Sequence, residues 1–596
     1  MSFTTFKDKT TSDKIVLCEI DIGKGHAVFI NTQAGVFEYT LNTSRINIPL
    51  RFGYGNFGYG NFGYDGTHTC GNPVHPASIG SVKVGGTSYT KKTTRATCIS
   101  TEQSFYYDYN TSILYLHCVD NDDPQLYLVI AGYTLGLSNK AININNAFYE
   151  PRLIGAPVIS KSKDPLYFGI ISFDEGTLTF NNEDGFFNNI TNDYIFGQPV
   201  VVRYGGDALT YAEYRVVYKG YIQSIDIDSK QLAIKVADNR KKLSRTLPIN
   251  YFDQTTYPDL SDDDIGKPIP ILYGRGRHIP VVCTNIEAST TEWTFKVCDV
   301  ADHTDGICNI NSAYLDGVNL TIKAKDLVNA TFTVDVANYT PTGADKGKPV
   351  TCIAWGYQEG GGSTELDDNA LDIIEDMLST YLAISYTTDY YDTTAWATAK
   401  SDARNAGVFI GKDTKIIDVI EKIALSTFGT FIIEDGGLYT FKVFDSGSTA
   451  TRTISKTEYL EEPAIEYDGT EYLTSCSIGS RPCHVDNTYQ WSNNTDNESI
   501  SYQKYGKYQH KSYETYLTNV DAGSSMGGDI MDYVKDIHGV VSIKTSIQNI
   551  DLEICDVVNF ELDRVNQDWM GETKVEIVDI QKNLLEGTVE LAGRII

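Results

Sequence analysis

The chain has 596 residues, which is more than one hydrophobic core can organise, so we expect about three to five domains. Hydrophobic residues make up 41% of it and charged residues 21%, a composition that excludes both a largely disordered chain and a membrane-embedded bundle. Asp and Glu (78) outnumber Lys and Arg (49), and this net charge of −29, with no basic block to offset it, argues against a protein that holds nucleic acid or an anionic membrane by charge.

The first 150 residues show the alternation of β-strands and almost no helical periodicity. Residues 15–20 and 27–30 are short apolar runs, and residues 81–84 and 87–90 flank a Gly-Gly turn of the kind that closes a hairpin. We therefore predict an N-terminal all-β peripheral domain over residues 1–150.

This region contains an internal repeat, three copies of a Phe-Gly-Tyr pentad over residues 52–66. Glycine at every second or third position removes side-chain packing and makes an ordered strand costly in entropy, so a surface loop lengthened by duplication explains the repeat. Tyr and Gly together are also typical of adaptable binding loops, which makes an aromatic contact loop the alternative. The contact residues of that loop would be Phe52, Tyr54, Phe57, Tyr59, Phe62 and Tyr64.

Strand signals continue through residues 151–250. Residues 176–180 lead into a turn at 181–185, and residues 218–227 and 231–236 are the two arms of a long hairpin. Regularly spaced strands of this kind indicate a barrel or a sandwich.

Three further modules follow along the chain. Residues 251–362 are predicted to form a β-rich middle module, which ends at the linker candidate Gly360-Gly361-Gly362-Ser363. Residues 363–450 form an α+β module with the first clear helices. The last module, residues 451–596, is mostly strands with one short helix near residues 529–535.

Two amphipathic helices are predicted within residues 363–450. The first carries an apolar stripe made of Leu366, Ala370, Ile373, Ile374, Met377 and Leu378. The second begins near Thr414, with Asp413 as its N-cap and Gly429 as its stop. A hairpin with an Asp435-Gly436-Gly437 turn follows the second helix.

No group of residues has catalytic or metal-binding spacing. His68, Cys70 and His75 could supply three metal ligands, but they lack a fourth partner and a recognised zinc spacing. The acidic turn at residues 120–123 lacks the Gly and the distant Glu of a helical calcium loop. Nucleophile-elbow, phosphate-cradling and His-Glu-x-x-His motifs are absent. The sequence therefore predicts no catalytic residue, no metal site and no cofactor, and so no enzyme.

The order of the segments along the chain resembles that of a known protein family, although no single motif does. The segments are residues 176–187, 218–236, 238–243 and 257–274 in the first half, and residues 418–424, 428–431, 435–436, 501–506, 521–522 and 552–558 in the second. Over about residues 150–596 this succession resembles the baseplate-hub or tail-tip proteins of tailed bacteriophages and phage-like particles. Cys555 departs from the pattern, which has Gly before the Asp-Val-Val sequence.

The resemblance implies a mainly β, multi-domain chain with a few helices, in which two tube-like β-barrels are joined by additional small β and α+β modules. It assigns the first hub barrel to residues 151–250 and the second to residues 451–596. Three chains would then carry six barrels, which continue the hexameric symmetry of the tail tube and convert it to threefold symmetry at the tip. A central channel would be closed before infection and open for DNA ejection.

The partners that the resemblance implies are two further copies in a homotrimer, the distal tail protein, the tape-measure protein and the central fibre or spike proteins. DNA would only pass through, without sequence-specific binding, and no cofactor is implied. The chain would be made in the host cytoplasm and would reside at the tail tip or baseplate of the virion. Two alternatives stay open: a tail adhesin that attaches to a host surface glycan or receptor, and a glycan-cleaving tail enzyme.

Overall fold

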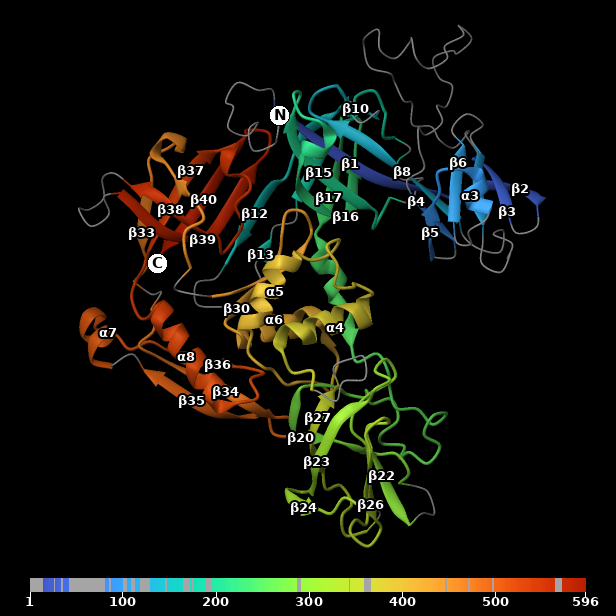
Figure 1. Ribbon diagram of the computed structural model, residues 1–596, viewed down its shortest axis with the longest axis vertical. Helices are drawn as coiled ribbons and strands as arrows, with labels where there is room; N and C mark the ends of the chain where they lie inside the picture. The colour runs from blue at the N-terminus through green and yellow to red at the C-terminus, as the bar shows by residue number, and fades with distance from the viewer. Residues whose placement is uncertain are drawn as a thin grey trace.

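Figure 1 shows the computed structural model of the chain, a mainly β, multi-domain protein with a few helices, which confirms the predicted fold class. The structure describes residues 14–25, 27–33, 36–41, 81–84, 87–99, 104–108, 113–117, 129–144, 147–163, 172–173, 176–188, 190, 195–286, 291–341, 343–358, 366–444, 448–469, 472–495, 498–562 and 571–596. Among these residues, no helix is both long and apolar enough to cross a membrane.

The largest sheet joins strands from the first 150 residues to strands from the next hundred. In hydrogen-bonded order its strands are β11 (Leu153–Gly155), β14 (Gly176–Asn181), β17 (Gln231–Ala237), β16 (Arg215–Ile227), β15 (Pro199–Gly206), β1 (Lys14–Gly25), β8 (Val129–Ser138), β4 (Ser81–Val84), β5 (Thr87–Lys91), β6 (Ser104–Asp108), β7 (Ile113–His117), β3 (Val36–Leu41) and β2 (Ala27–Gln33); off this path, β10 (Ala147–Pro151) pairs with β8, and β9 (Ile142–Ile144) pairs with β10. Strand β1 is the connection, because Ile20 pairs with Val200 of β15 on one side and with Leu135 of β8 on the other. One continuous sheet therefore runs across residue 150.

A second large sheet is built mainly from the C-terminal residues. In order its strands are β13 (Ser172–Phe173), β12 (Val158–Ser162), β39 (Gly571–Asn583), β40 (Thr588–Ile595), β37 (Gly539–Ser546) and β33 (Ala464–Tyr467), and β38 (Val557–Leu562) joins β39 to β32 (Thr453–Ile454). Strands β12 and β13 come from the first half of the chain and complete this sheet, since Ile159 of β12 pairs with Lys582 of β39. The two large sheets lie side by side in Figure 1.

One hydrophobic core fills the space between the two large sheets. Alternate residues of each strand face inward, as in β14, where Leu178 and Phe180 are fully buried. These side chains belong to the same buried cluster as Ile577 and Leu591 of the second sheet. Because the cluster is continuous, the two sheets pack as one body.

The middle of the chain forms smaller sheets. A seven-stranded sheet contains β24 (Val318–Leu320), β23 (Ile307–Leu315), β27 (Val350–Tyr357), β20 (Arg275–Pro280), β34 (Ser475–Cys483) and β35 (Thr488–Thr495), with β36 (His510–Glu514) beside β34. A four-stranded sheet contains β21 (Val282–Cys283), β22 (Glu292–Lys296), β26 (Thr331–Asp335) and β25 (Ala324–Asp326). Three strand pairs are β18 (Thr246–Leu247) with β29 (Thr414–Lys415), β19 (Ile271–Tyr273) with β28 (Val408–Ile410), and β30 (Gly429–Ile433) with β31 (Tyr439–Val443).

The helices gather below the two large sheets in Figure 1. They are α4 (Ala370–Leu382), α5 (Thr393–Asp402), α6 (Ile416–Ser426), α7 (Glu498–Tyr505) and α8 (Val520–Val534), and the short α3 (Arg95–Ile99) lies in the N-terminal part. We refer to α4, α5, α6 and the β30–β31 hairpin as the helical module. Its core is continuous with that of the middle sheets, since Ile374 and Ile420 belong to the same buried cluster as Ile310.

The predicted ends of the second helix were wrong. Asp413 does not cap it, because Thr414 and Lys415 pair with β18 and the helix begins only at Ile416. Phe428, with φ of 54°, takes the left-handed position after the helix, and Gly429 opens strand β30. Strand pairing on either side of the helix therefore sets both of its ends, and the local capping signals do not.

Candidate functional site: a buried charged junction

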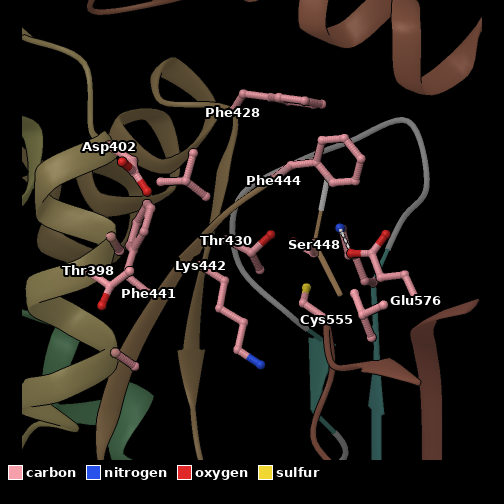
Figure 2. A pocket seen from close by; sticks show the side chains of 15 residues that line it. Thr398, Asp402, Phe428, Thr430, Phe441, Lys442, Phe444, Ser448, Cys555 and Glu576 are labelled. Carbon is pink, nitrogen blue, oxygen red and sulfur yellow. Dashed lines mark hydrogen bonds and ion pairs between the residues drawn. The ribbon is translucent and has the colours of Figure 1, made fainter. Parts of the chain in front are cut away.

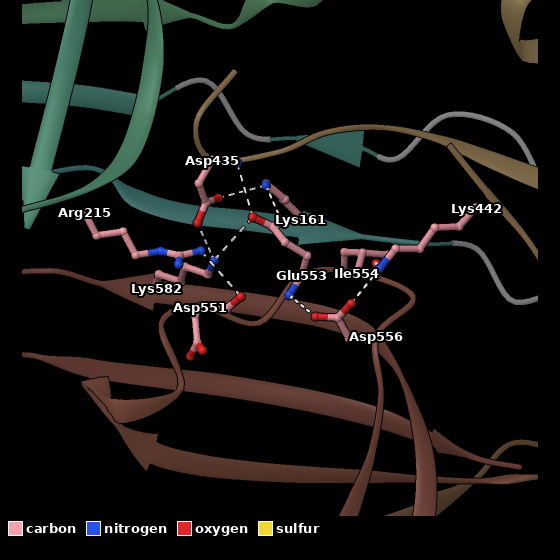
Figure 3. Close-up of polar contacts among 9 residues, drawn as sticks. All are labelled: Lys161, Arg215, Asp435, Lys442, Asp551, Glu553, Ile554, Asp556 and Lys582. Atoms are coloured by element: carbon pink, nitrogen blue, oxygen red, sulfur yellow. Dashed lines mark hydrogen bonds and ion pairs between the residues drawn. The ribbon is translucent and has the colours of Figure 1, made fainter. Parts of the chain in front are cut away.

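Four charged side chains from distant segments meet where the helical module contacts the second large sheet (Figure 3). Lys161 of β12 donates to Asp435 at 2.8 Å and to Glu553 at 2.7 Å. Lys582 of β39 donates to Asp435 at 2.5 Å and lies 3.8 Å from Glu553. The backbone N–H of Asp435 also donates a hydrogen bond to Glu553 Oε1 at 3.2 Å. We call these four residues the charged junction.

The charged junction is almost entirely shielded from water, with Lys161 1% and Lys582 0% exposed. Burial alone would raise the pKa of Asp435, but the two lysine ammonium groups outweigh it and hold that pKa below its usual value. Burial would likewise lower the pKa of Lys161, but Asp435 and Glu553 raise it. Asp435 and Lys161 are therefore both charged at neutral pH, and the charge of each offsets the cost of burying the other.

A second buried charge cluster lies beside the first. Lys163 donates to Glu576 at 2.7 Å, and the Tyr533 hydroxyl donates to the other carboxylate oxygen at 2.6 Å. The guanidinium of Arg594 covers the Tyr533 ring at 3.9 Å from its centroid. Burial would raise the pKa of Glu576, but Lys163 and Tyr533 outweigh it and lower that pKa. This cluster connects β39 and β40 to helix α8.

Glu434, which lies next to the charged junction, has a raised pKa. Burial raises the pKa of Glu434 to about 7, helped by the nearby charges of Glu553 and Asp392 and opposed by Lys442 and Lys161. Lys442 is itself paired with Asp556 at 2.5 Å. Glu434 therefore changes its charge close to neutral pH.

A cavity of about 290 Å³ separates the helical module from the second sheet next to these clusters. Figure 2 shows Phe441 and Thr398 on the helical side and Cys555 and Glu576 on the sheet side, with Lys442 between them. Its walls mix aromatic rings with ammonium, hydroxyl, thiol and carboxylate groups, so the cavity is not a dry apolar void.

Cys555 has a backbone conformation that is unusual for its residue type. Its φ is 65°, in the left-handed region that favours glycine, and its N–H donates to the carbonyl oxygen of Ile577 at 2.9 Å. This geometry explains why the pattern that the sequence resembles has Gly at this position. Burial raises the pKa of the Cys555 thiol, although Lys163 and Lys442 oppose that shift.

We expect Cys555→Gly to be more stable than Cys555→Ala by about 1 kcal/mol, because both variants lose the sulfur and only glycine relieves the left-handed strain. Urea unfolding of the two variants measures the difference. A Cys555→Gly variant that is no more stable than Cys555→Ala would show that the turn is unstrained.

The structure leaves one set of predicted residues untested. The contact loop Phe52, Tyr54, Phe57, Tyr59, Phe62 and Tyr64 lies outside the described residues, as do His68, Cys70 and His75. Among the residues that the structure does describe, no group of three or more His, Cys, Asp or Glu side chains is placed to hold a metal ion.

Sequence reasoning missed the charged junction, although a signal for it exists. Ile159 and Lys161 are both buried on one face of β12, and Ile580 and Lys582 share one face of β39. A lysine in the inward register of an alternating strand predicts a buried partner. The partner itself could not be found this way, because Asp435 stands in an Asp-Gly turn that is usually solvent-exposed.

What this arrangement can do is mechanical. Each cation lies against a carboxylate, and the four groups come from two strands, a tight turn and a loop, so they fix one segment against another. The charged junction joins β12, the β30–β31 hairpin, the loop before β38, and β39; Asp435 lies 274 residues from Lys161 and 147 from Lys582.

Comparison with known proteins gives distant structural likenesses and no sequence match. No protein-family model and no curated protein sequence matches it. Similar solved structures include the tail protein from Neisseria meningitidis MC58, at TM-score 0.35 and 9% identity over 76% of this chain and 95% of that one. A chain of the virion of the native gene transfer agent particle has TM-score 0.40 and 9% identity over 60% and 90%. The 43 kDa tail protein of prophage MuSo2 from Shewanella oneidensis has TM-score 0.33 and 10% identity over 76% and 95%.

These neighbours are tail and virion proteins, the class that the sequence resembles. All three TM-scores are below 0.5.

Proposed function

We propose that this chain is a structural protein of a phage-like tail, and specifically the hub of its baseplate or tail tip. The observation that carries the proposal is the rigid joint: two large sheets share one core, and the buried charged junction fixes the helical module against them. A ring subunit that transmits force between a tube and a tip needs such a joint, because a hinge between its parts would absorb the movement.

The proposed assembly is a homotrimer. Each chain contributes two large sheets side by side, which we interpret as two tube-like barrels, so three chains would supply six units to match a hexameric tube. A channel along the threefold axis would be lined by an acidic protein, since each chain carries a net charge of −29. Such a wall repels phosphate groups and would let DNA slide through without binding.

The proposed neighbours are the distal tail protein, the tape-measure protein and a central fibre or spike, at the tip of the virion tail. No chemical turnover is part of this role. Strands β2, β3 and β6 lie at the far end of the molecule from the C-terminal sheet (Figure 1), where they could contact a neighbouring tail protein or the host surface.

The mass of the purified chain in solution tests the proposal. We expect light scattering to give about three times 66.1 kDa and negative-stain images to show closed threefold rings, either alone or after mixing with the distal tail protein. A chain that stays monomeric alone and also in the presence of the distal tail and tape-measure proteins would contradict the hub.

A further inference from the structure

An exposed aromatic platform lies at the end of helix α7, at the outer edge of the molecule in Figure 1. The rings of Tyr502 and Tyr508 stack with their centroids 4.1 Å apart and an interplanar angle of 12°. Tyr508 is 60% exposed and Tyr502 38%, although both are large rings. Because Tyr502 covers one face of Tyr508, the opposite face of Tyr508 is open to a ligand.

The platform is held in place by its surroundings. Gly506, with φ of 73°, donates its N–H to the carbonyl oxygen of Tyr502 at 2.7 Å and turns the chain back, so that Tyr508 reaches Tyr502. The Tyr472 hydroxyl donates to the carbonyl oxygen of Lys507 at 2.8 Å. The two rings are therefore preorganised, which lowers the entropic cost of binding.

The segment that carries this platform is basic in an otherwise acidic chain. Residues 501–513 contain no Asp or Glu, and they carry Lys504, Lys507 and Lys511 together with His510. Lys504 is paired with Asp536, and Lys511 lies over the Tyr513 ring at 5.4 Å. Lys507 is exposed and has no acidic partner among the described residues.

We propose that the Tyr502–Tyr508 platform binds an acidic polysaccharide. The apolar face of one sugar ring packs on the open face of Tyr508, and a carboxylate or phosphate group of the polymer pairs with Lys507. The positive charge of this segment is complementary to an acidic polymer, whereas the net negative charge of the chain as a whole would repel one.

A sparsely charged polymer fits better than a nucleic acid for two reasons. Nucleic-acid strands need successive stacking platforms, whereas this segment offers one stacked pair of tyrosines, because Tyr505 is half-buried and Tyr513 is buried. Nucleic acid also carries a charge on every nucleotide, and the few lysines of this segment would have to offset that charge within a chain of net charge −29.

This binding activity goes beyond the structural role and does not depend on the oligomeric state. The test uses the full-length chain and measures calorimetric affinity for three probes: a hyaluronan decasaccharide, a neutral dextran of similar length and a dT10 oligonucleotide. We expect the wild-type chain to bind hyaluronan more tightly than the other two. Tyr508→Ala should weaken this binding about fivefold, the loss of one ring contact.

The two components of the site are separated by a second variant and by controls. Lys507→Gln should remove the preference for hyaluronan over dextran, while Tyr467→Ala and Lys325→Gln, which alter an exposed tyrosine and an exposed lysine elsewhere, should change nothing. Unchanged thermal unfolding of each variant shows that it is folded. The proposal is overturned if no sugar polymer binds at millimolar concentration, if Tyr508→Ala binds as well as wild type, or if dT10 binds more tightly than hyaluronan.

Discussion

Replacing Asp435 with asparagine is expected to lower the free energy of unfolding by about 3–5 kcal/mol, the largest effect of any single substitution considered for this chain. The variant keeps the shape of the side chain but leaves the ammonium groups of Lys161 and Lys582 with Glu553 as their only carboxylate. Two buried cations then share one anion, and no water replaces the missing charge. Urea unfolding, combined with hydrogen exchange of residues 429–443, measures the loss.

The matched control is Asp532→Asn, the same chemical change at a pair with Lys535 in which the aspartate side chain is 72% exposed. That pair is screened by solvent, so its loss should cost less than about 1 kcal/mol. Adding Lys582→Met to Asp435→Asn should cost less than the sum of the two single variants, because the unpaired cation is removed. Additive losses would show that the charged junction does not act as a unit.

Replacing Glu434 with glutamine is expected to stabilise the protein at pH 8 and to have little effect at pH 4.5. The pKa of Glu434 rises from 4.5 to about 7 on folding, because burial and the charges of Glu553 and Asp392 disfavour its ionised form. The folded state therefore binds more protons between these two values, and stability is lost as the pH rises from about 4.5 to about 7. Above pH 7 the penalty is constant.

The difference between Glu434→Gln and wild type should reach on the order of 2 kcal/mol at pH 8, after allowance for the partial exposure of this side chain. Urea unfolding at pH 4.5, 6, 7 and 8 measures it. Glu466→Gln is the control, because Glu466 is exposed on edge strand β33. If the stability difference between Glu434→Gln and wild type is the same at all four pH values, Glu434 does not titrate on folding as described.

Much of the local structure could be predicted from the sequence. The alternation in residues 176–180 and 231–236 gave strands that pair as expected, with Leu178 opposite Ile234. The apolar stripe from Ala370 to Leu378 gave helix α4 and is buried, whereas Leu366, predicted on the same stripe, lies before the helix and forms a β-bridge with Gln358. Helix α5 was missed because it shows no apolar stripe, and Asp392 caps it with hydrogen bonds to the N–H groups of Thr394 and Ala395.

The candidate site could be predicted only in part. The turn at Asp435 and the departure of Cys555 from glycine were both visible in the sequence, and the structure explains the second by a left-handed backbone. Of the aromatic and basic segment at residues 501–513, only residues 501–506 entered the sequence analysis, as part of the family pattern. The net charge of −29 did not reveal this basic segment, because a net charge does not show where along the chain the lysines are concentrated.

The sequence by itself determined what depends on near neighbours: the strand periodicity, the Asp-Gly turn between β30 and β31, and the dominance of β structure. Only the tertiary structure decided which sheet each strand joins and which charges are buried. Strand β12 pairs with β39, which begins at Gly571, more than four hundred residues later, and Asp435 meets Lys161 across 274 positions. Local propensity acts over a few residues, whereas pairing and desolvation are set by packing between segments that no local pattern connects.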